Sequence, residues 1–256
     1  SYNSLAHRTT WLRSDLVQDV SFQMQPGEIL GIVGESGSGK STLIRAVMGL
    51  LEPQGMVTKG DIYYRGQNVT DASKSELSRL RGPAMGMIFQ NTQAALCPVR
   101  TIEDQLYESV QQHEKISRQK IKERAMELFE NMRLTDGERI LKSYPFELSG
   151  GMNQRVGIMM AMVMKPDLLL ADEPTSALDV TVQAQVVREM VRMRELYDTG
   201  IAIVTHNIGV VEYMADRVAV MHQGKLVEYG SKEEVIHHPR EEYTRKLLGA
   251  VLHLRR

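Results

Sequence analysis

The chain has 256 residues, 42% of them hydrophobic and 25% charged, and its 31 lysines and arginines against 32 aspartates and glutamates leave a formal charge of −1. This composition is ordinary for a globular protein with a large core, and it lacks the basic excess that would favour nucleic acid as an obligatory partner. A single cysteine excludes an internal disulfide, no run reaches the roughly 20 apolar residues of a membrane span, and the start lacks a signal-peptide pattern, so we expect a soluble intracellular protein.

Short apolar runs alternate with longer helical patterns along most of the chain. The expected strands are Ile29–Val33 and residues 61–65, 86–89, 168–171, 201–205, 218–221 and 225–229. The expected helices cover residues 39–50, 150–164 and 181–197, with further polar helices between residues 101 and 133. Because buried strands alternate with helices, the pattern predicts an α/β fold with a mostly parallel sheet.

The domain organisation follows from where this alternation is interrupted. A polar helical stretch over residues 91–160 separates two α/β segments, residues 1–90 and 161–230, and residues 231–256 form a tail. We therefore expect one domain over residues 1–256, in which a helical subdomain is inserted into the α/β core and a helical tail follows it.

The strongest local signal is a glycine-rich octet between the first strand and the first helix. It reads Gly34-Glu35-Ser36-Gly37-Ser38-Gly39-Lys40-Ser41 and is followed by Thr42. This is the spacing of a phosphate-binding loop, in which backbone N–H groups and a helix N-terminus surround an anion. Lys40 would supply a full positive charge, Ser41 a hydroxyl for Mg²⁺, and Thr42 a further phosphate contact. A plain Gly/Ser turn before a helix is the alternative, which the strand–loop–helix context disfavours.

An acidic pair ends the apolar strand expected at residues 168–171. The pair is Asp172 and Glu173, and the carboxyl ends of parallel strands border the ligand crevice of an open α/β sheet. We expect Asp172 to hold Mg²⁺, directly or through water, and Glu173 to polarise an attacking water. A turn leaving the strand is the alternative interpretation, and the phosphate loop in the same chain weakens it.

A second glycine-rich helix start lies upstream of the acidic pair. Ser149, Gly150, Gly151 and Met152 open the helix expected at residues 150–164, which would give the chain a second anion-binding helix N-terminus. Two such ends in one chain suggest that the second serves a nucleotide bound by a partner subunit. A simple helix start with a Gly-Gly turn is the alternative.

These motifs occur in the order phosphate loop, Gln90, Leu-Ser-Gly-Gly-Met, acidic pair and His206, and this order resembles the ATP-binding cassette (ABC) of transport ATPases over nearly the whole chain. Residues 144–152, 171–185 and 215–221 are similar to those of ATP-binding subunits of peptide and nickel importers, and residues 243–248 resemble that subgroup's C-terminal helix. The resemblance implies a P-loop NTPase fold with an antiparallel β region beside the parallel core, and an ATPase that uses ATP and Mg²⁺.

The resemblance also implies roles for individual residues. Gln90 would link Mg²⁺ and the attacking water to the helical subdomain, and His206 would contact the γ-phosphate beside the catalytic Glu173. The adenine would stack on an aromatic ring before the first sheet, for which Tyr2 fits best and Trp11 is the runner-up. The family's D-loop would consist of Ser176, Ala177, Leu178 and Asp179.

Four departures from the family pattern stand out. Met152 replaces the glutamine common in cassettes, although methionine is usual in this subgroup, and Asn207 replaces an aspartate with little expected effect. Thr92 and Cys97 replace a proline and an asparagine in the loop after Gln90, which is expected to face the membrane subunit, so they affect partner identity more than activity. The cysteine-bearing extension of the longest oligopeptide-type members is not present, so no iron–sulfur site is expected.

As partners, the resemblance implies a related but non-identical second ABC ATPase, two transmembrane permeases and an extracytoplasmic binding protein, with this chain at the cytoplasmic face of the membrane. The cargo stays open among peptides, nickel and other metal chelates. Three alternatives fit less well. A non-transport cassette usually has two cassettes or a coiled-coil insertion, a small-molecule kinase needs no Ser-Gly-Gly helix start, and a catalytically silent cassette would not need Lys40, Glu173 and His206.

Overall fold

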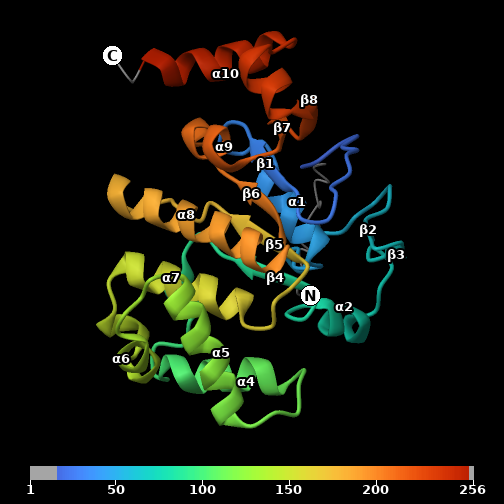
Figure 1. Cartoon of the computed structure of the whole chain (residues 1–256). Helices are drawn as coiled ribbons and strands as arrows, with labels where there is room; N and C mark the ends of the chain where they lie inside the picture. Colours follow the sequence, from blue (N-terminus) through green and yellow to red (C-terminus); the bar gives the residue numbers. More distant parts are fainter. Residues whose placement is uncertain (1–15, 254–256) are drawn as a thin grey trace, which may run out of the picture.

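A six-stranded sheet runs through the centre of the computed structural model, which describes residues 16–253 (Figure 1). The strand order is β4-β5-β6-β1-β7-β8, and only the pair β7–β8 is antiparallel. The strands are β4 (Met85–Ile88), β5 (Leu168–Asp172), β6 (Gly200–Val204), β1 (Ile29–Val33), β7 (Arg217–His222) and β8 (Lys225–Ser231). The predicted parallel core with an antiparallel region is therefore confirmed.

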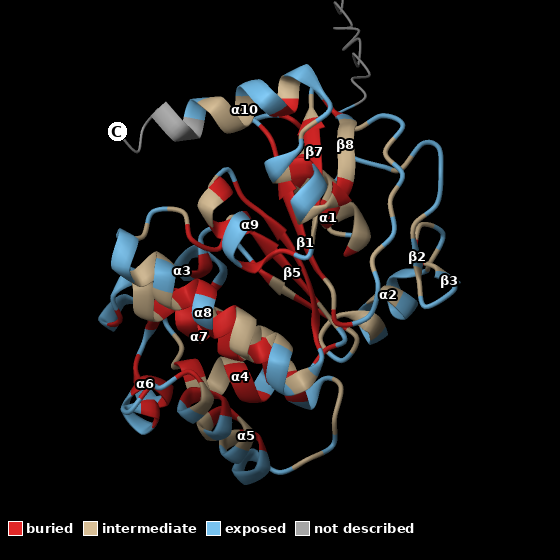
Figure 2. Cartoon of the chain, turned by 45° about the horizontal axis from the view of Figure 1, so that its top comes forward, coloured by how far each residue is buried: buried red, intermediate tan, exposed pale blue. Residues whose placement is uncertain are grey.

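Helices cover both faces of this sheet, which is why its central strands are apolar throughout rather than alternating with polar residues. Side chains from β1 divide between the faces: Ile29 and Val33 join one buried cluster, while Leu30 and Ile32 join the other. The second face packs on α1 (Lys40–Val47), and Figure 2 shows the central strands in the colour of buried residues.

A block of helices lies between β4 and β5 in the sequence and beside the sheet in space (Figure 1). It comprises α3 (Thr92–Ala95), α4 (Ile102–Gln111), α5 (Arg118–Asn131), α6 (Gly137–Lys142) and α7 (Gly150–Met162). Thr101, Ser117 and Ser149 each cap a helix with a side-chain oxygen, so these starts are encoded locally. Because Phe129 and Met159 belong to the same buried cluster as one face of the sheet, the block shares that core.

The second half adds α8 (Val180–Tyr197), α9 (Ile208–Met214), a π-helical turn at Glu233–His237 and α10 (Glu242–His253). The short helices α2 (Lys74–Leu80), α3, α6 and α9 were not predicted. The strand expected at residues 61–65 is reduced to the two residues of β2 (Tyr63–Tyr64), because the chain reverses at Arg65 and Gly66, both with positive φ, into β3 (Gln67–Asn68). Over residues 16–253, no helix combines the length and apolar character needed to cross a membrane.

Candidate functional site

The predicted site residues gather where parallel strands end at one edge of the sheet. The phosphate loop follows β1, Gln90 follows β4, Asp172 ends β5, and His206 follows β6. Since β4, β5, β6 and β1 are neighbours in that order, the strand ends lie side by side. Tertiary structure thus brings four separate motifs to a single edge, which is where open α/β sheets bind ligands.

The phosphate loop is held in a conformation that requires glycine at its ends. Gly34 has a φ of 151°, and a Cβ there would collide with the backbone carbonyl of Met221. Gly39 has a φ of 93° and stands as N-cap of α1 without a side-chain cap of its own. The first N–H groups of α1 therefore follow directly after the loop with no side-chain cap from Gly39.

Lys40 begins α1 and is only 6% exposed. Its Nζ donates to the carbonyl oxygens of Gly34 (2.9 Å) and Glu35 (2.7 Å), and it lies 3.3 Å from Ser38 Oγ. Burial lowers the pKa of Lys40 from its usual 10.5, against the opposing influence of Glu173, Asp172 and Glu35. The loop thus bends around an ammonium group, for which a bound phosphate would compete.

Asp172 is fully buried, and its carboxylate connects β5 to α1. Ser41 Oγ donates to Asp172 Oδ1 at 2.6 Å, and Arg45 Nη2 lies 3.3 Å from Oδ2. The oxygen atoms of Ser41 and Asp172 suit a hard cation such as Mg²⁺, which commonly binds one or two carboxylates together with substrate phosphates. Sequence analysis missed Arg45, although its position one helical turn after Ser41 places both on the same face of α1.

Glu173 and His206 form the second polar pair of the site. His206 Nδ1 lies 2.9 Å from Glu173 Oε2, and the side chain of His206 is 71% exposed whereas that of Glu173 is 13% exposed. Glu173 has a φ of 49°, a left-handed conformation that is uncommon for a non-glycine residue, and its N–H donates to Val204 O. This geometry directs a largely buried carboxylate toward the exposed histidine.

The other predicted site residues make no polar contact with the side chains of Asp172 or Glu173 among the described residues. Gln90 is exposed, and among the described residues no hydrogen bond or ion pair connects it to Asp172 or Glu173. In the expected D-loop, Ser176 donates through its N–H and hydroxyl to the Glu173 carbonyl, and Asp179 caps α8. The aromatic candidates Tyr2 and Trp11 lie outside the described residues.

The glycine-rich start of α7 is a separate feature of the surface. Ser149 accepts a hydrogen bond from the Met152 N–H at 3.2 Å, and Ser149 and Gly150 are exposed. Within residues 16–253, no polar contact joins residues 149–152 to the phosphate loop. The structure also contains no group of three or more His, Cys, Asp or Glu side chains suited to a metal among its described residues.

Known proteins resemble this chain in sequence. The family model of ABC transporters matches residues 17–176. The chain is 44% identical over 236 residues to the oligopeptide transport ATP-binding protein OppD of Bacillus subtilis, a match that covers 92% of this chain and 66% of that protein. It is 40% identical over 240 residues to the metal-staphylopine import ATP-binding protein CntD of Staphylococcus aureus, covering 94% of this chain and 88% of that protein.

Solved structures agree with the fold. A dimeric structure of the ATP-binding cassette MJ0796, described as a post-hydrolysis state bound to ADP and Pi, superposes with a TM-score of 0.73 at 27% identity. The superposition covers 84% of this chain and 90% of that one. Since the family model matches more than half of the chain and both relatives align over more than nine-tenths of it, the chain belongs to the ABC transporter family.

Proposed function

We propose that this chain is the ATP-binding and ATP-hydrolysing subunit that energises an importer for peptides, nickel or a related metal chelate across the cytoplasmic membrane. The observation that carries the proposal is the meeting of Lys40, the Ser41–Asp172 pair and the Glu173–His206 pair at one sheet edge. The relatives named for oligopeptide and metal-staphylopine import support the cargo class.

Each residue of this edge has a role that its position supports. The N–H groups of the loop and Lys40 bind the phosphates, and Ser41 and Asp172 would hold Mg²⁺, which would neutralise phosphate charge. Glu173 would polarise the attacking water, because its carboxylate is largely shielded from solvent and lies beside His206 at the strand ends. His206 would orient that carboxylate through its Nδ1, and its exposed ring would contact the γ-phosphate.

The start of α7 completes the site of a second cassette rather than its own. Ser149, Gly150, Gly151 and Met152 would contact the nucleotide held by the partner, so ATP would close the pair and hydrolysis would reopen it. The D-loop would lie at the same interface between the two cassettes; it consists of Ser176, Ala177, Leu178 and Asp179. Gln90 would report the closure to the helical subdomain, for which we propose residues 91–160 between core segments 1–90 and 161–230, with the tail at 231–256.

Exposed apolar side chains after Gln90 support the proposal that this face docks on the permeases. Val99 is 78% exposed and Phe146 65%, and Phe146 stacks on Tyr144 with ring centroids 5.5 Å apart. The N–H of Ile102 donates to the carbonyl of Ser143, which brings the two apolar segments together. Exposed apolar side chains grouped in this way are typical of interaction sites.

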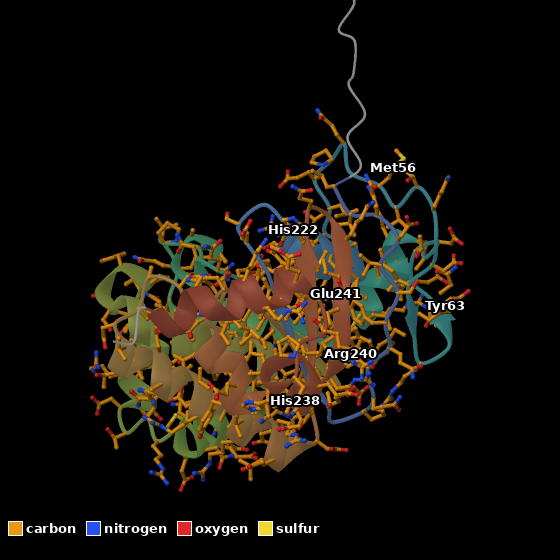
Figure 3. The ribbon with its side chains drawn as sticks, turned by 90° about the horizontal axis from the view of Figure 1, so that it is seen from above. Met56, Tyr63, His222, His238, Arg240 and Glu241 are labelled. Carbon is orange, nitrogen blue, oxygen red and sulfur yellow. The ribbon has the colours of Figure 1, made fainter. Side chains whose placement is uncertain are left out.

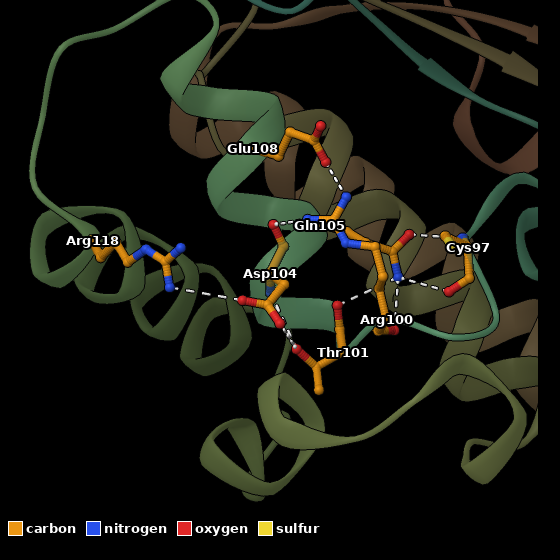
Figure 4. Close-up of polar contacts among 7 residues, drawn as sticks. All are labelled: Cys97, Arg100, Thr101, Asp104, Gln105, Glu108 and Arg118. Atoms are coloured by element: carbon orange, nitrogen blue, oxygen red, sulfur yellow. Dashed lines mark hydrogen bonds and ion pairs between the residues drawn. The ribbon is translucent and has the colours of Figure 1, made fainter.

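A polar network holds the loop that carries Val99 (Figure 4). The side chain of Gln105 accepts from the Cys97 N–H at 2.7 Å and donates to the carbonyls of Cys97 at 3.1 Å and Arg100 at 3.0 Å. Arg100 also pairs with Glu108. Because both ends of the loop are tied to α4, Val99 is presented from a fixed backbone.

The proposed partners are a non-identical second cassette, two permeases and an extracytoplasmic binding protein, with this chain on the cytoplasmic face. A tagged chain captured from native membranes in mild detergent should co-purify with a second ATPase and with permeases. Recovery of permeases with this chain as the only ATPase would contradict the non-identical pair and indicate a homodimer.

The catalytic proposal is tested by Glu173→Gln in the assembled pair of cassettes, which consists of this chain and its partner ATPase. The amide keeps the shape of the side chain but loses the carboxylate, so phosphate release at this site should fall about 10²–10⁴-fold while ATP still binds. Glu212→Gln, at an exposed position on α9, is the matched control and should release phosphate normally. Near-normal release by Glu173→Gln would show that another group activates the water.

A further inference from the structure

The C-terminal helix α10 is anchored beside β8, at the top of the view in Figure 1. The carboxylate of Glu228 in β8 accepts hydrogen bonds from the N–H groups of Arg240 (2.8 Å) and Glu241 (3.3 Å), just before the helix begins. Thr244 in its first turn is fully buried, and Leu248 packs on the main core. These contacts fix the position of the helix start, which Figure 3 shows close to His222.

Tyr243 reaches from this anchored helix to the phosphate loop. Its hydroxyl oxygen accepts a hydrogen bond from the backbone N–H of Glu35 at 3.3 Å, across 208 positions of sequence. Its ring lies against the ring of His222, with centroids 3.9 Å apart. Burial raises the pKa of Tyr243, so the phenol stays protonated and neutral beside the loop.

The turn between β7 and β8 holds the same loop at a second point. The Gly224 N–H donates to the Ser38 carbonyl at 3.1 Å. His222, which supports the Tyr243 ring, lies two residues earlier. Two contacts from the C-terminal quarter of the chain therefore hold the loop, one at Glu35 and one at Ser38.

These contacts differ from those of Lys40 in a way that matters for nucleotide binding. The Lys40 ammonium contacts the carbonyls of Gly34 and Glu35, and a phosphate would draw it away from them. The Glu35 N–H is donated to Tyr243, so this contact does not depend on the ammonium that a phosphate would recruit. Tyr243 can therefore hold the first turn of the loop while Lys40 turns to its ligand.

We infer that Tyr243 is a positioning residue, through which helix α10 holds the phosphate loop in its nucleotide-binding shape and so sets nucleotide affinity. The inference rests on the proposed function, since it concerns the same nucleotide site. A purely space-filling role for the Tyr243 ring against His222 is the competing explanation. The hydroxyl distinguishes the two, because only the positioning role needs it.

Tyr243→Phe keeps the ring and removes the hydrogen bond. Titration with a fluorescent ATP analogue should show the Kd rise roughly three- to tenfold, the equilibrium equivalent of one net hydrogen bond. In the assembled pair, KM for ATP should rise similarly while kcat stays within twofold. Tyr213→Phe is the matched control, because Tyr213 on α9 is 61% exposed and lies outside the site.

A second variant tests the anchor of the helix. Glu228→Gln can accept only one of the two N–H bonds through its amide oxygen, so it should raise the Kd less than Tyr243→Phe does. Far-UV circular dichroism and thermal unfolding establish the folded fraction of each variant.

The outcomes separate this inference from the proposed function. An unchanged Kd in Tyr243→Phe overturns the inference, even if the variant unfolds at a lower temperature, because the hydroxyl would then be structural only. An equal rise in Tyr213→Phe would overturn it as well. Failure of the wild-type chain to bind ATP would instead overturn the proposed function.

Discussion

Two helices of this chain begin at glycine-rich sequences suited to phosphate, yet their surroundings differ. At the start of α1, Lys40 is buried in the loop and Ser41 bonds to Asp172, so charged and polar side chains from α1 and β5 already surround the helix end. At the start of α7, Ser149 caps its own helix and the neighbouring Gly150 is exposed. This difference supports the proposal that the first site binds nucleotide within one chain and that the second contacts a nucleotide held by another.

The largest expected effect removes the charge of the first site. Lys40→Ala should weaken ATP binding by more than about a hundredfold, because the loop loses its only full positive charge. Titration of the isolated chain with a fluorescent ATP analogue measures the loss. Lys225→Ala, at an exposed position in β8, should bind as the wild type does. If Lys40→Ala bound ATP with wild-type affinity, the start of α1 would not be the nucleotide site, and the proposed difference between the two helix starts would be wrong.

A buried ion pair connects α7, the helix that begins at the second glycine-rich sequence, to α8. Arg155 on α7 pairs with Glu189 on α8, and Arg155 Nη2 also donates to the Met132 carbonyl at 2.7 Å. Glu189→Ala would leave the buried arginine charge without its carboxylate partner, so the free energy of unfolding should fall by about 3–5 kcal/mol. Urea denaturation measures it, with the exposed Glu195→Ala as control. Equal stability of the two variants would show that the pair does not hold α7 in place.

The second helix start is tested by adding charge to it. A side chain at Gly150 would meet nothing within 4 Å, and Asp near a helix N-terminus is favourable, so Gly150→Asp should fold. The isolated chain should bind ATP normally, while turnover in the assembled pair should fall about ten- to a hundredfold through repulsion of the partner's nucleotide. Gly150→Asn controls for side-chain size. Loss of ATP binding in the isolated Gly150→Asp chain would show that both starts serve one site.

A hydrogen bond ties the segment after Gln90 to α7. Thr92 Oγ1 donates to Gln154 Oε1 at 2.8 Å. Thr92→Val should lower the free energy of unfolding by about 1–2 kcal/mol, because the Gln154 oxygen loses its partner in a buried place. Thr92→Ser keeps the hydroxyl and should be less affected. A larger loss in the serine variant would assign the effect to the methyl group instead.

The smallest effect concerns pH. Burial lowers the pKa of Lys40 below 10.5, so the free chain loses the ammonium proton at a lower pH than an exposed lysine would. Since the phosphates bind the protonated form, ATP affinity should be constant near neutral pH and fall as pH rises toward 10.5. Titrations at several alkaline pH values measure this, with Lys40→Arg as control because arginine keeps its charge. The same decline in Lys40→Arg would assign it to another group.

Local patterns in the sequence were enough to predict the ends of β1, the phosphate loop and the acidic pair, because each depends on residues within a few positions of one another. The same patterns predicted the start of α7 and the two strands β7 and β8, whereas an antiparallel region was implied only by the family resemblance. They did not predict the short helices α2, α3, α6 and α9, whose few residues carry too little periodicity.

Contacts between distant residues were decided only by the tertiary structure. Ser41 and Asp172 are 131 positions apart in the sequence, and they meet because only β6 lies between β5 and β1 in the sheet. The pairing of Glu173 with His206 and the contact of Tyr243 with Glu35 arise in the same way. Residue types and spacing specify what chemistry a segment can perform, whereas the order of strands in the sheet specifies which segments perform it together.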